Sequence, residues 1–512
     1  MTATTRETFT GRMPLPLGAR FLSDRALDVA VAIGILLASV LAGMAVLDPR
    51  WGVLVLPAIG LAVLVGIAAV SRGALVGFTV LGVANGIPGL DLESFAVSGF
   101  FRPSDLLIMF LIGALGFWHL TTTSDVAVDR RWQAAIRAWS LVFLSWWLLT
   151  FARSALFSDI PPLQAALFGR DFLYFGLLVV LLPVAFRRRS DLVALVAMLA
   201  LGGTIFALAQ TATSLFPQVS GIFDPAVLVN ETFTNEFEGL TRLYSYMGDV
   251  VLLGAVVAGG VAVIARSRYW RRWGSVLFVI LTVGALTQLS RGAYAALLAG
   301  LLLVIVAALM RASEPLVVAR RVIPAAVLVV ALFPVLSLVH PTETESVSAA
   351  QVFATRAESG IEEIQARSGT FGYRYDVQSQ MLDLVGNRWP IGLGFWHPDT
   401  RYVGSLPEGS IRNTDVGVLN GITTIGAIGT GLLYLPVLAT IVFLVRRRRP
   451  GLDNWGGLVF GAAGWFFGVV VASISLVTLF TVPGLVLTAV VMVAAVSIAT
   501  RPDGAVGVPE RT

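Results

Sequence analysis

Long apolar runs separated by short polar segments dominate the chain, and this pattern predicts a bundle of membrane helices. A helix needs about 20 mostly apolar residues to cross roughly 30 Å of hydrocarbon. We count about 14 such runs. They cover residues 26–47, 51–70, 74–90, 105–120, 138–157, 163–186, 192–215, 247–265, 274–289, 293–310, 322–339, 416–445, 456–476 and 482–500. We therefore expect an all-α, polytopic membrane protein with about 14 transmembrane helices.

Two connecting segments are much longer than the others. One covers residues 216–246, and the larger, 340–415, is rich in charged residues and is long enough to form a small subdomain. Apolar residues at helical spacing within 361–385 predict a helix that lies on the membrane surface. The expected order is an N-terminal tail 1–25, helices within 26–339, the large loop 340–415, helices within 416–500, and a C-terminal tail 501–512.

The distribution of arginine predicts which side of the membrane each loop of this bundle faces. All 36 basic residues of the chain are arginine. If the N-terminus is cytoplasmic, 24 of the 36 lie in the two tails and the inside loops, and each inside loop carries at least one. Cytoplasmic loops of membrane proteins show this excess of basic residues. Both termini are therefore expected on the cytoplasmic side of the inner membrane, with the large loop outside.

Composition narrows the classes of function. The chain is 56% hydrophobic and 13% charged, with a net charge of +5, and soluble domains carry about 25% charged residues. This balance excludes a soluble enzyme or a nucleic-acid binder. The absence of lysine and cysteine excludes lysine Schiff bases, thiol nucleophiles and cysteine-bound zinc. With only three histidines (His119, His340 and His397) we expect no metal site and no cofactor.

Twelve arginines remain that the inside loops do not explain. They are Arg50, Arg102, Arg153, Arg170, Arg242, Arg291, Arg356, Arg367, Arg374, Arg388, Arg401 and Arg412. A guanidinium presents a planar fork of donors that matches phosphate oxygens and stays charged at physiological pH. The set is a shortlist for an anionic substrate, and solvated loop charges or contacts with lipid phosphate are the alternative. For Arg170 and Asp171, a charge pair between adjacent helices is the simpler account.

Arg291 is the most informative of these arginines. It lies in Leu289-Ser290-Arg291-Gly292, between two apolar runs with almost no loop. A charge at the edge of the hydrocarbon is costly and usually functional. The alternative is an arginine at a helix end whose charged head reaches up into the headgroup region.

Four pieces of sequence, in a fixed order, resemble the bacterial superfamily of O-antigen ligases and O-antigen or exopolysaccharide polymerases. They are Arg242-Leu243-Tyr244-Ser245 before a span, Leu289-Ser290-Arg291-Gly292 between spans, Gly372-Tyr373-Arg374 followed by Pro390-Ile391-Gly392-Leu393-Gly394, and Asn413-Thr414-Asp415 before the next span. The resemblance covers roughly residues 241–445. It rests on order, spacing and topology together.

The resemblance implies a GT-C-like membrane glycosyltransferase that uses polyprenyl-diphosphate-linked sugars at the outer face of the membrane. The diphosphate would be bound by Arg242, Arg291, Arg374 and Arg412, and no metal ion is implied. Arg291 and Arg374 would stabilise the charge of the leaving group. Asp415 would accept the proton of the acceptor hydroxyl as general base. Asp415 also suits a helix N-cap, and the two roles are compatible.

One position departs from the ligases of this superfamily, which carry a histidine at the entrance to the span after the large loop. Aligning on Gly426 and Gly429 places Asp415 there, and a shift of three residues places Arg412 there. An aspartate is more similar to the polymerases. We therefore expect a polymerase of lipid-linked oligosaccharide units, with ligase-like transfer of a finished glycan to a lipid or wall acceptor as the alternative.

Other classes fit less well. A transporter or flippase for lipid-linked glycans would carry midplane charges in two matched halves, and the charges here gather at the outer boundary. A peptidoglycan polymerase of the shape-and-division type fits the Ser-Arg-Gly and P-x-G-x-G pieces less well. The expected partners are a polyprenyl-diphosphate-linked glycan and membrane lipid, with a flippase and chain-length regulators as further candidates and no nucleic acid.

Overall fold

The computed structural model describes fourteen stretches of the chain: residues 52–87, 102–121, 130–157, 161–216, 233–237, 240–311, 315–339, 348–366, 376, 378–383, 385–395, 417–446, 455–473 and 478–500. It divides into two compact units, Met1–Leu75 and Val76–Thr512. In the first unit, α2 (Gly52–Val70) is an apolar helix of 19 residues. Its length matches the expected span at 51–70.

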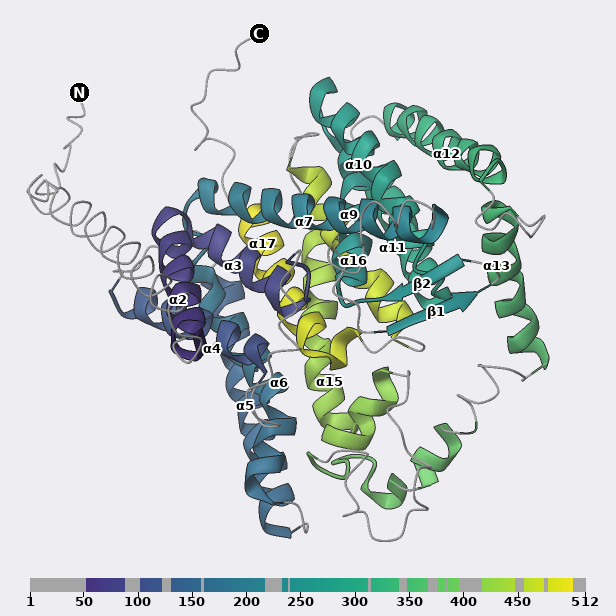
Figure 1. The fold of residues 1–512 in the computed structure, drawn as a ribbon. Coiled ribbons are helices and arrows are strands. Elements are labelled where there is room, and N and C mark those ends of the chain that lie inside the picture. The colour runs from purple at the N-terminus through teal and green to yellow at the C-terminus, as the bar shows by residue number, and fades with distance from the viewer. Residues whose placement is uncertain are drawn as a thin grey trace, which may run out of the picture. The chain divides into compact units, whose positions relative to one another are not determined.

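The second unit is built almost entirely of helices (Figure 1). After α3 (Arg72–Val83), which begins in the first unit, come α4 (Pro103–Thr121), α5 (Arg130–Phe157), α6 (Pro162–Leu181), α7 (Arg189–Leu215), α9 (Met247–Ile264), α10 (Arg268–Leu286), α11 (Arg291–Arg311), α12 (Pro315–Ser337), α13 (Ala349–Ala366), α15 (Gly417–Arg446), α16 (Gly456–Ala472) and α17 (Val482–Thr500). Short 3₁₀ turns are η2 (Leu182–Val184), η4 (Gly386–Arg388) and η5 (Thr478–Phe480).

Every expected apolar run from residue 51 onward contains a helix, and the run at 26–47 lies outside the described residues. Among the described residues, eight helices are long and apolar enough to cross a membrane. The chain is therefore a multi-pass membrane protein. The total of about 14 spans stays a prediction.

The run at 74–90 forms a shorter helix than a span requires. Helix α3 has 12 residues, or about 18 Å at 1.5 Å per residue. It ends because Asn85 adopts a left-handed conformation with φ of 58°. The amides of Asn85 and Gly86 then donate to the carbonyls of Gly82 and Leu81, at 3.1 and 2.7 Å. This pair of hydrogen bonds is the Schellman pattern that closes many helices.

Small residues allow the helices of the interior to approach closely. Helix α16 packs against both α9 and α11. A Cβ atom added at Gly260 of α9 would lie 2.5 Å from the carbonyl oxygen of Gly457, and one added at Gly464 would lie 2.5 Å from that of Gly300 in α11. Such contacts are typical of membrane helices, whose association depends on close packing. Helices α9, α11 and α16 therefore form a tightly packed group beside α10 (Figure 1).

A short β-hairpin lies within the segment 216–246, where the sequence predicts only a loop. Strands β1 (Phe233–Phe237) and β2 (Leu240–Tyr244) pair antiparallel, with Phe233 opposite Tyr244 and Phe237 opposite Leu240. The strands precede α9 directly, so they connect the loop to the start of a membrane helix. The all-α expectation is thus correct for the bundle and misses this hairpin.

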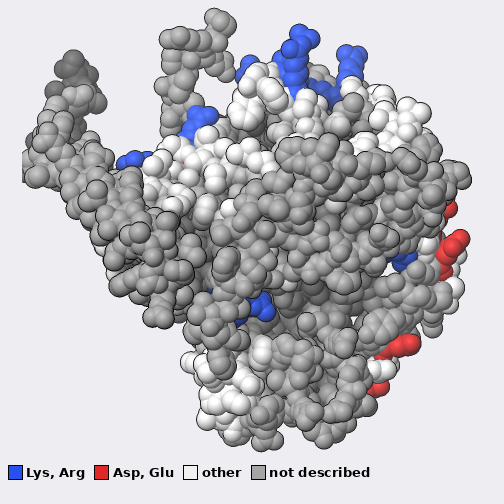
Figure 2. Space-filling model, in the orientation of Figure 1, with Lys and Arg blue, Asp and Glu red and all other residues white. Residues whose placement is uncertain are grey.

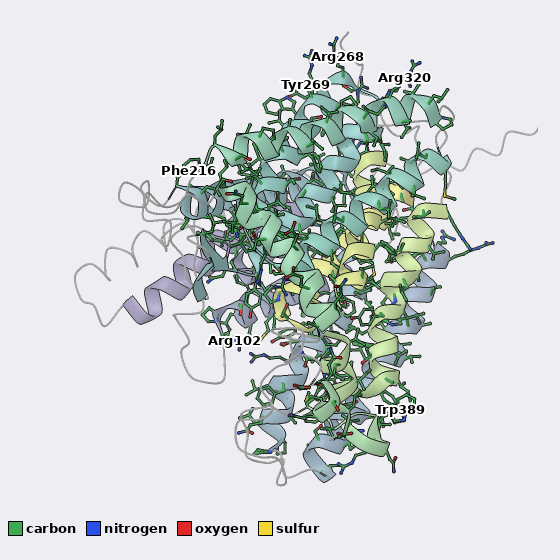
Figure 3. The ribbon with its side chains drawn as sticks, turned by 90° about the vertical axis from the view of Figure 1, so that its right-hand side faces the viewer. Arg102, Phe216, Arg268, Tyr269, Arg320 and Trp389 are labelled. Carbon is green, nitrogen blue, oxygen red and sulfur yellow. The ribbon has the colours of Figure 1, made fainter. Side chains whose placement is uncertain are left out.

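The two ends of the second unit differ in their side chains. Figure 3 shows Arg268, Tyr269 and Arg320 at one end and Trp389 at the opposite end. In Figure 2, blue arginine side chains gather at the first of these ends, over α10 and α12. Arg268 and Arg320, which the sequence assigns to inside loops, therefore lie at the opposite end from Trp389 of the large loop (Figure 3).

Candidate active site

The turn between α10 and α11 carries the Leu-Ser-Arg-Gly sequence. Leu289 is fully buried and has a positive φ of 50°, which costs a non-glycine residue about 1–3 kcal/mol. Ser290 precedes α11, and its hydroxyl accepts a hydrogen bond from the amide of Ala293 at 3.4 Å. Serine is a favoured residue at this N-cap position. Arg291 is consequently the first residue of an apolar, 21-residue helix.

Arg291 contacts a helix of the large loop. Its Nε donates to the carbonyl oxygen of Arg356 at 3.3 Å, and its Nη2 donates to the hydroxyl of Ser359 at 2.9 Å. Arg356 in turn donates from its Nε to the carbonyl oxygen of Leu289 at 3.2 Å. The two arginines therefore hold α13 against the α10–α11 turn by reciprocal hydrogen bonds.

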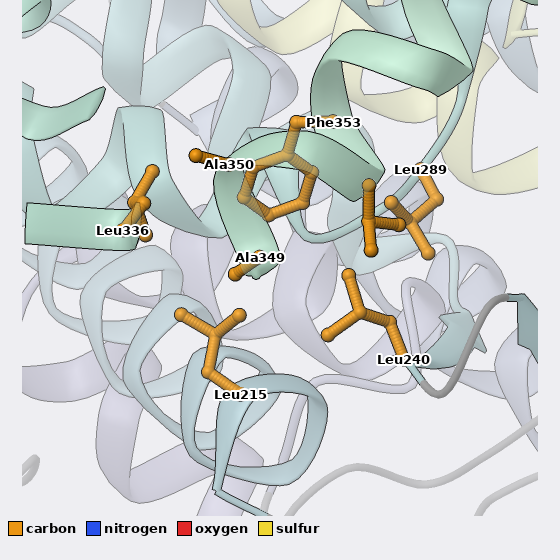
Figure 4. Packing of buried hydrophobic residues seen from close by; sticks show 8 residues of the cluster. Leu215, Leu240, Leu289, Leu336, Ala349, Ala350 and Phe353 are labelled. Atoms are coloured by element: carbon orange, nitrogen blue, oxygen red, sulfur yellow. The ribbon is translucent and has the colours of Figure 1, made fainter. Parts of the chain in front are cut away.

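An apolar cluster lies beneath α13 and supports this contact (Figure 4). The cluster joins the ends of α7, β2, α10 and α12 to the buried face of α13. Its members are Leu215, Leu240, Leu289, Leu336, Ala349, Ala350, Val352 and Phe353. Because Leu289 belongs to the cluster, burial of its side chain offsets the strain of its backbone. Packing and hydrogen bonds together fix the position of Arg291.

Helix α13 begins earlier than the sequence pattern predicts. The expected helix covered 361–385, whereas α13 runs from Ala349 to Ala366 and the backbone is helical again at 378–383. Ser348 and Gln351 explain the start, because the amide of Ser348 donates to Gln351 Oε1 at 2.9 Å and its hydroxyl accepts from the amide of Gln351 at 3.4 Å. This is a capping box.

The start of α9 lies against the same turn. Gln288 donates from Nε2 to the carbonyl oxygen of Gly248 at 3.1 Å. The next residue, Asp249, is half-buried and accepts a hydrogen bond from the hydroxyl of Thr478 in η5 at 3.1 Å. A carboxylate is thus connected through α9 to the turn that carries Arg291.

The Pro-x-Gly-x-Gly sequence packs into a break in α15. Gly426 interrupts that helix with φ of 74° and ψ of 172°. The amides of Leu393 and Gly394 donate to the carbonyls of Thr423 and Thr424, at 2.6 and 3.0 Å. In the other direction, the carbonyls of Trp389 and Pro390 accept from the amides of Ala427 and Ile428, at 2.9 and 3.1 Å. The loop therefore satisfies backbone groups that the broken helix leaves without partners, as irregular backbone in a membrane protein requires.

Glycine is required at the two positions where these backbones meet. Gly392 has φ of +71°, and a Cβ there would lie 2.5 Å from the amide nitrogen of Gly426. A Cβ at Gly426 would meet the backbone of Pro390 and Ile391. Both contacts are with backbone atoms, which have little room to move. The glycines of the motif thus position the loop on α15.

Phe395 anchors the end of this segment. It is fully buried, and its amide donates to the hydroxyl of Ser154 in α5 at 2.8 Å. Its ring packs on Gly169 of α6 and lies 5.9 Å from the ring centre of Trp147. The segment from the large loop is therefore inserted among α5, α6 and α15.

Arg170 takes part in a buried ion pair. Its Nη1 lies 3.1 Å from Oδ2 of Asp105 in α4, whose carboxylate is 1% exposed. Its Nε lies 3.6 Å from Oδ1 of Asp171, its neighbour in the chain. The same oxygen of Asp105 accepts from the amide of Arg102 at 2.9 Å and so caps α4. The sequence interpretation of a charge pair between helices is correct for Arg170, although the partner on the other helix is Asp105.

Of the five predicted site residues, Arg291 is the one whose side chain the structure describes. Arg242 lies in β2 opposite Asn235. Arg374, Arg412 and Asp415 lie outside the described residues. In the described part of the chain, no three His, Asp or Glu side chains gather as a metal-ligand group.

Sequence reasoning did not single out Arg356 and Ser359. Arg356 is one of the twelve arginines that the inside loops do not explain. Its side chain donates a hydrogen bond to a backbone carbonyl, and a bond of this kind produces no recognisable sequence motif. Their spacing of three residues on one face of a helix is the available signal.

Residues 276–434 match the family model described as O-antigen ligase. This part of the chain, under a third of its length, is therefore similar to that family, in agreement with the resemblance found in the sequence. It begins within α10 and ends within α15, so it includes the Arg291 turn, α13 and the Pro-x-Gly-x-Gly contact. A search of curated proteins returns no match. The similarity supports a membrane glycosyltransferase-like function.

Proposed function

We propose that the chain polymerises polyprenyl-diphosphate-linked oligosaccharide units into a surface polysaccharide at the outer face of the cytoplasmic membrane. The observation that carries the proposal is the position of Arg291. It lies at the first residue of an apolar helix, half-buried, in direct contact with the large loop, inside the segment that matches the superfamily. A cation held rigidly at this boundary suits a diphosphate that remains attached to lipid.

In the proposed reaction the acceptor hydroxyl attacks the anomeric carbon of the donor sugar. The bond between that carbon and the diphosphate oxygen breaks, and the electron pair leaves with polyprenyl diphosphate. Arg291 and Arg374 stabilise the charge that develops there, with Arg242 and Arg412 as further phosphate ligands. Asp415 accepts the hydroxyl proton. Preorganised guanidinium groups serve here in place of a divalent metal ion.

The matching family model is described as O-antigen ligase, and this observation favours transfer of a finished glycan as the second candidate. The aspartate at position 415, where ligases of the superfamily carry histidine, supports the polymerase. The two activities differ in their acceptor. A polymerase adds its chain to another lipid-linked glycan, whereas a ligase delivers the chain to a different lipid or to the wall.

The test uses the purified full-length protein in lipid discs with a synthetic polyprenyl-diphosphate oligosaccharide. We expect a ladder of longer lipid-linked glycans, one polyprenyl diphosphate released per bond, and no loss of rate when EDTA is added. R291A and R374A should each lower the rate by about 10²–10³-fold, the usual cost of removing one charge-stabilising donor. R102A is the matched control, because Arg102 is an exposed arginine of the same set of twelve.

Cells that carry R291A together with R374A separate the candidate functions. Loss of long-chain glycan with lipid-linked units accumulating outside supports the polymerase. Normal lengthening with no delivery to the final acceptor supports the ligase. Units that accumulate inside would instead indicate a transporter.

A further inference from the structure

The Pro-x-Gly-x-Gly segment lies at the level of a membrane boundary. Helix α15 continues for about 20 residues from Gly426 to Arg446, or about 30 Å at 1.5 Å per residue. The hydrocarbon core of a bilayer is also about 30 Å thick. Because the charge of Arg446 belongs in one headgroup region, Gly426 lies at the opposite boundary. The segment that packs on Gly426 lies there too.

Gly426 also forms the tip of α15. A Cβ atom added at Gly421 would meet the hydroxyl of Thr430, whereas a straight helix would separate two residues this far apart in sequence by about 13 Å. The part of α15 before the break therefore folds back beside the part after it. Neither part of α15 extends beyond the level of Gly426.

Helix α5 places the segment at a similar level. The amide of Phe395 donates to the hydroxyl of Ser154 at 2.8 Å. Ser154 follows Arg131, near the start of α5, by about 23 residues, or about 35 Å of helix. Two helices that reach the segment separately thus place it near the same boundary.

An exposed apolar stripe on α15 leads towards this boundary. Its members are Ile428, Leu435, Leu438 and Val442. Their sequence positions are separated by close to whole helical turns, so they share one face of the helix. In a multi-pass membrane protein, an exposed apolar face of this length contacts acyl chains.

Trp389 and Ile391 extend this stripe beyond the end of the helix. The carbonyl of Pro390, between them, accepts a hydrogen bond from the amide of Ile428 at 3.1 Å. Their side chains are 55% and 40% exposed, and Ile428 is 47% exposed. Figure 3 shows Trp389 at the end of the bundle opposite Arg268. A tryptophan that continues a lipid-facing stripe at a membrane boundary lies at the level that its amphipathic ring favours.

We propose that Trp389 and Ile391 insert into the phospholipid headgroup region at this end of the bundle and attach the large loop to the bilayer. Phospholipid covers the exposed surface, because the surface is continuous with the stripe on α15 that faces acyl chains. Lipid contact and the docking of α13 on the Arg291 turn then fix the large loop at two separate places. The attachment does not depend on the proposed glycosyl transfer.

The experiment measures the membrane depth of single labelled positions in the full-length protein, reconstituted in phosphatidylcholine discs. The chain has no cysteine, so one introduced cysteine carries the only thiol-reactive fluorophore. Two quenchers are compared: a nitroxide attached to the lipid headgroup and iodide in the buffer. W389C and I391C should each lose most of their fluorescence to the headgroup nitroxide and little to iodide. Both variants alter exposed side chains only, so both should fold.

Two exposed positions calibrate the depth scale. L435C, in the middle of the stripe, should be quenched most by a nitroxide near the end of an acyl chain, and E358C on α13 should be quenched by iodide. Quenching of W389C and I391C by iodide as strong as that of E358C would overturn the proposal and would leave Trp389 to contact water or glycan. Quenching by neither reagent would also overturn it, because protein would then cover the surface.

Discussion

Arg291 and Arg356 exchange hydrogen bonds through backbone oxygens: Arg291 donates to the carbonyl of Arg356, and Arg356 donates to the carbonyl of Leu289, two residues before Arg291. Neither bond joins the two guanidinium groups to each other. Both guanidinium groups therefore lie at the junction of α11 and the large loop, and each donates to a backbone carbonyl across that junction. Arg291 thus has a structural role that any test of its chemistry must separate.

Arg356 should be required for the docking of α13. In R356A the carbonyl of Leu289 loses a charged donor, and bonds of this kind contribute about 1.5–3 kcal/mol. Amide hydrogen exchange of α13 should accelerate by roughly 10- to 100-fold. E358Q changes an exposed residue of the same helix and serves as control. Unchanged exchange in R356A would show that the apolar cluster alone holds the helix.

The structural and chemical roles of Arg291 can be separated with Ser359. S359A removes one acceptor of Arg291 and leaves its charge, so turnover should fall by less than about tenfold, the equivalent of one hydrogen bond. R291K keeps a charge without the planar fork and should lose most of the activity. Polymer formation per folded protein is the measurement. An equal loss in S359A and R291K would mean that Arg291 acts only by holding α13.

Gly426 should tolerate no side chain. The combination of φ 74° and ψ 172° is essentially restricted to glycine, and a non-glycine residue there costs about 1–3 kcal/mol before any collision with Pro390. G426A should lower the thermal unfolding temperature markedly or prevent folding. Gly431 is the control in the same helix, since nothing lies within 4 Å of an added Cβ. G431A should be neutral or stabilising by up to about 1 kcal/mol.

Removing one member of the ion pair between Asp105 and Arg170 should destabilise the protein strongly. D105N removes the closer of the two carboxylates that contact Arg170, and breaking a buried pair in this way costs up to about 3–5 kcal/mol. D105L/R170M removes both charges and should recover much of that loss. D171N breaks a longer and more exposed contact and should cost less. Thermal unfolding in detergent ranks the variants, and equal losses in D105N and D171N would refute this assignment.

Asp415 should be needed for catalysis and not for donor binding. D415N should lower the rate by about 10²–10⁴-fold, the range for general base catalysis, with unchanged affinity for the lipid-linked donor. D249N is the comparison, because Asp249 is a half-buried carboxylate connected to the Arg291 turn. A large loss of activity in D249N together with an active D415N would indicate that Asp249 in α9 is the general base instead of Asp415.

The sequence predicts the helices well because apolar length is a local property, and every expected run from residue 51 contains a helix. It also places Arg291 correctly between two helices. The hairpin was missed because five-residue strands depend on a partner strand for stability. The break at Gly426 was missed because its cause lies in Pro390 and Ile391, more than thirty residues earlier in the chain. Arg356 was missed because bonds to backbone oxygen leave no pattern of side chains.

The contact between the Pro-x-Gly-x-Gly segment and α15 limits how the large loop can be studied. A deletion of residues 340–415 would remove four hydrogen bonds between the broken helix and residues 389–394. It would also remove the buried ring of Phe395 from its contacts with α5 and α6. We expect such a truncated protein to be destabilised, so a loss of its activity would not identify catalytic residues. Point variants are therefore better suited to studying the large loop. A tag in the loop, or the loop excised as a soluble fragment, would have to keep the backbone hydrogen bonds between residues 389–394 and 423–428.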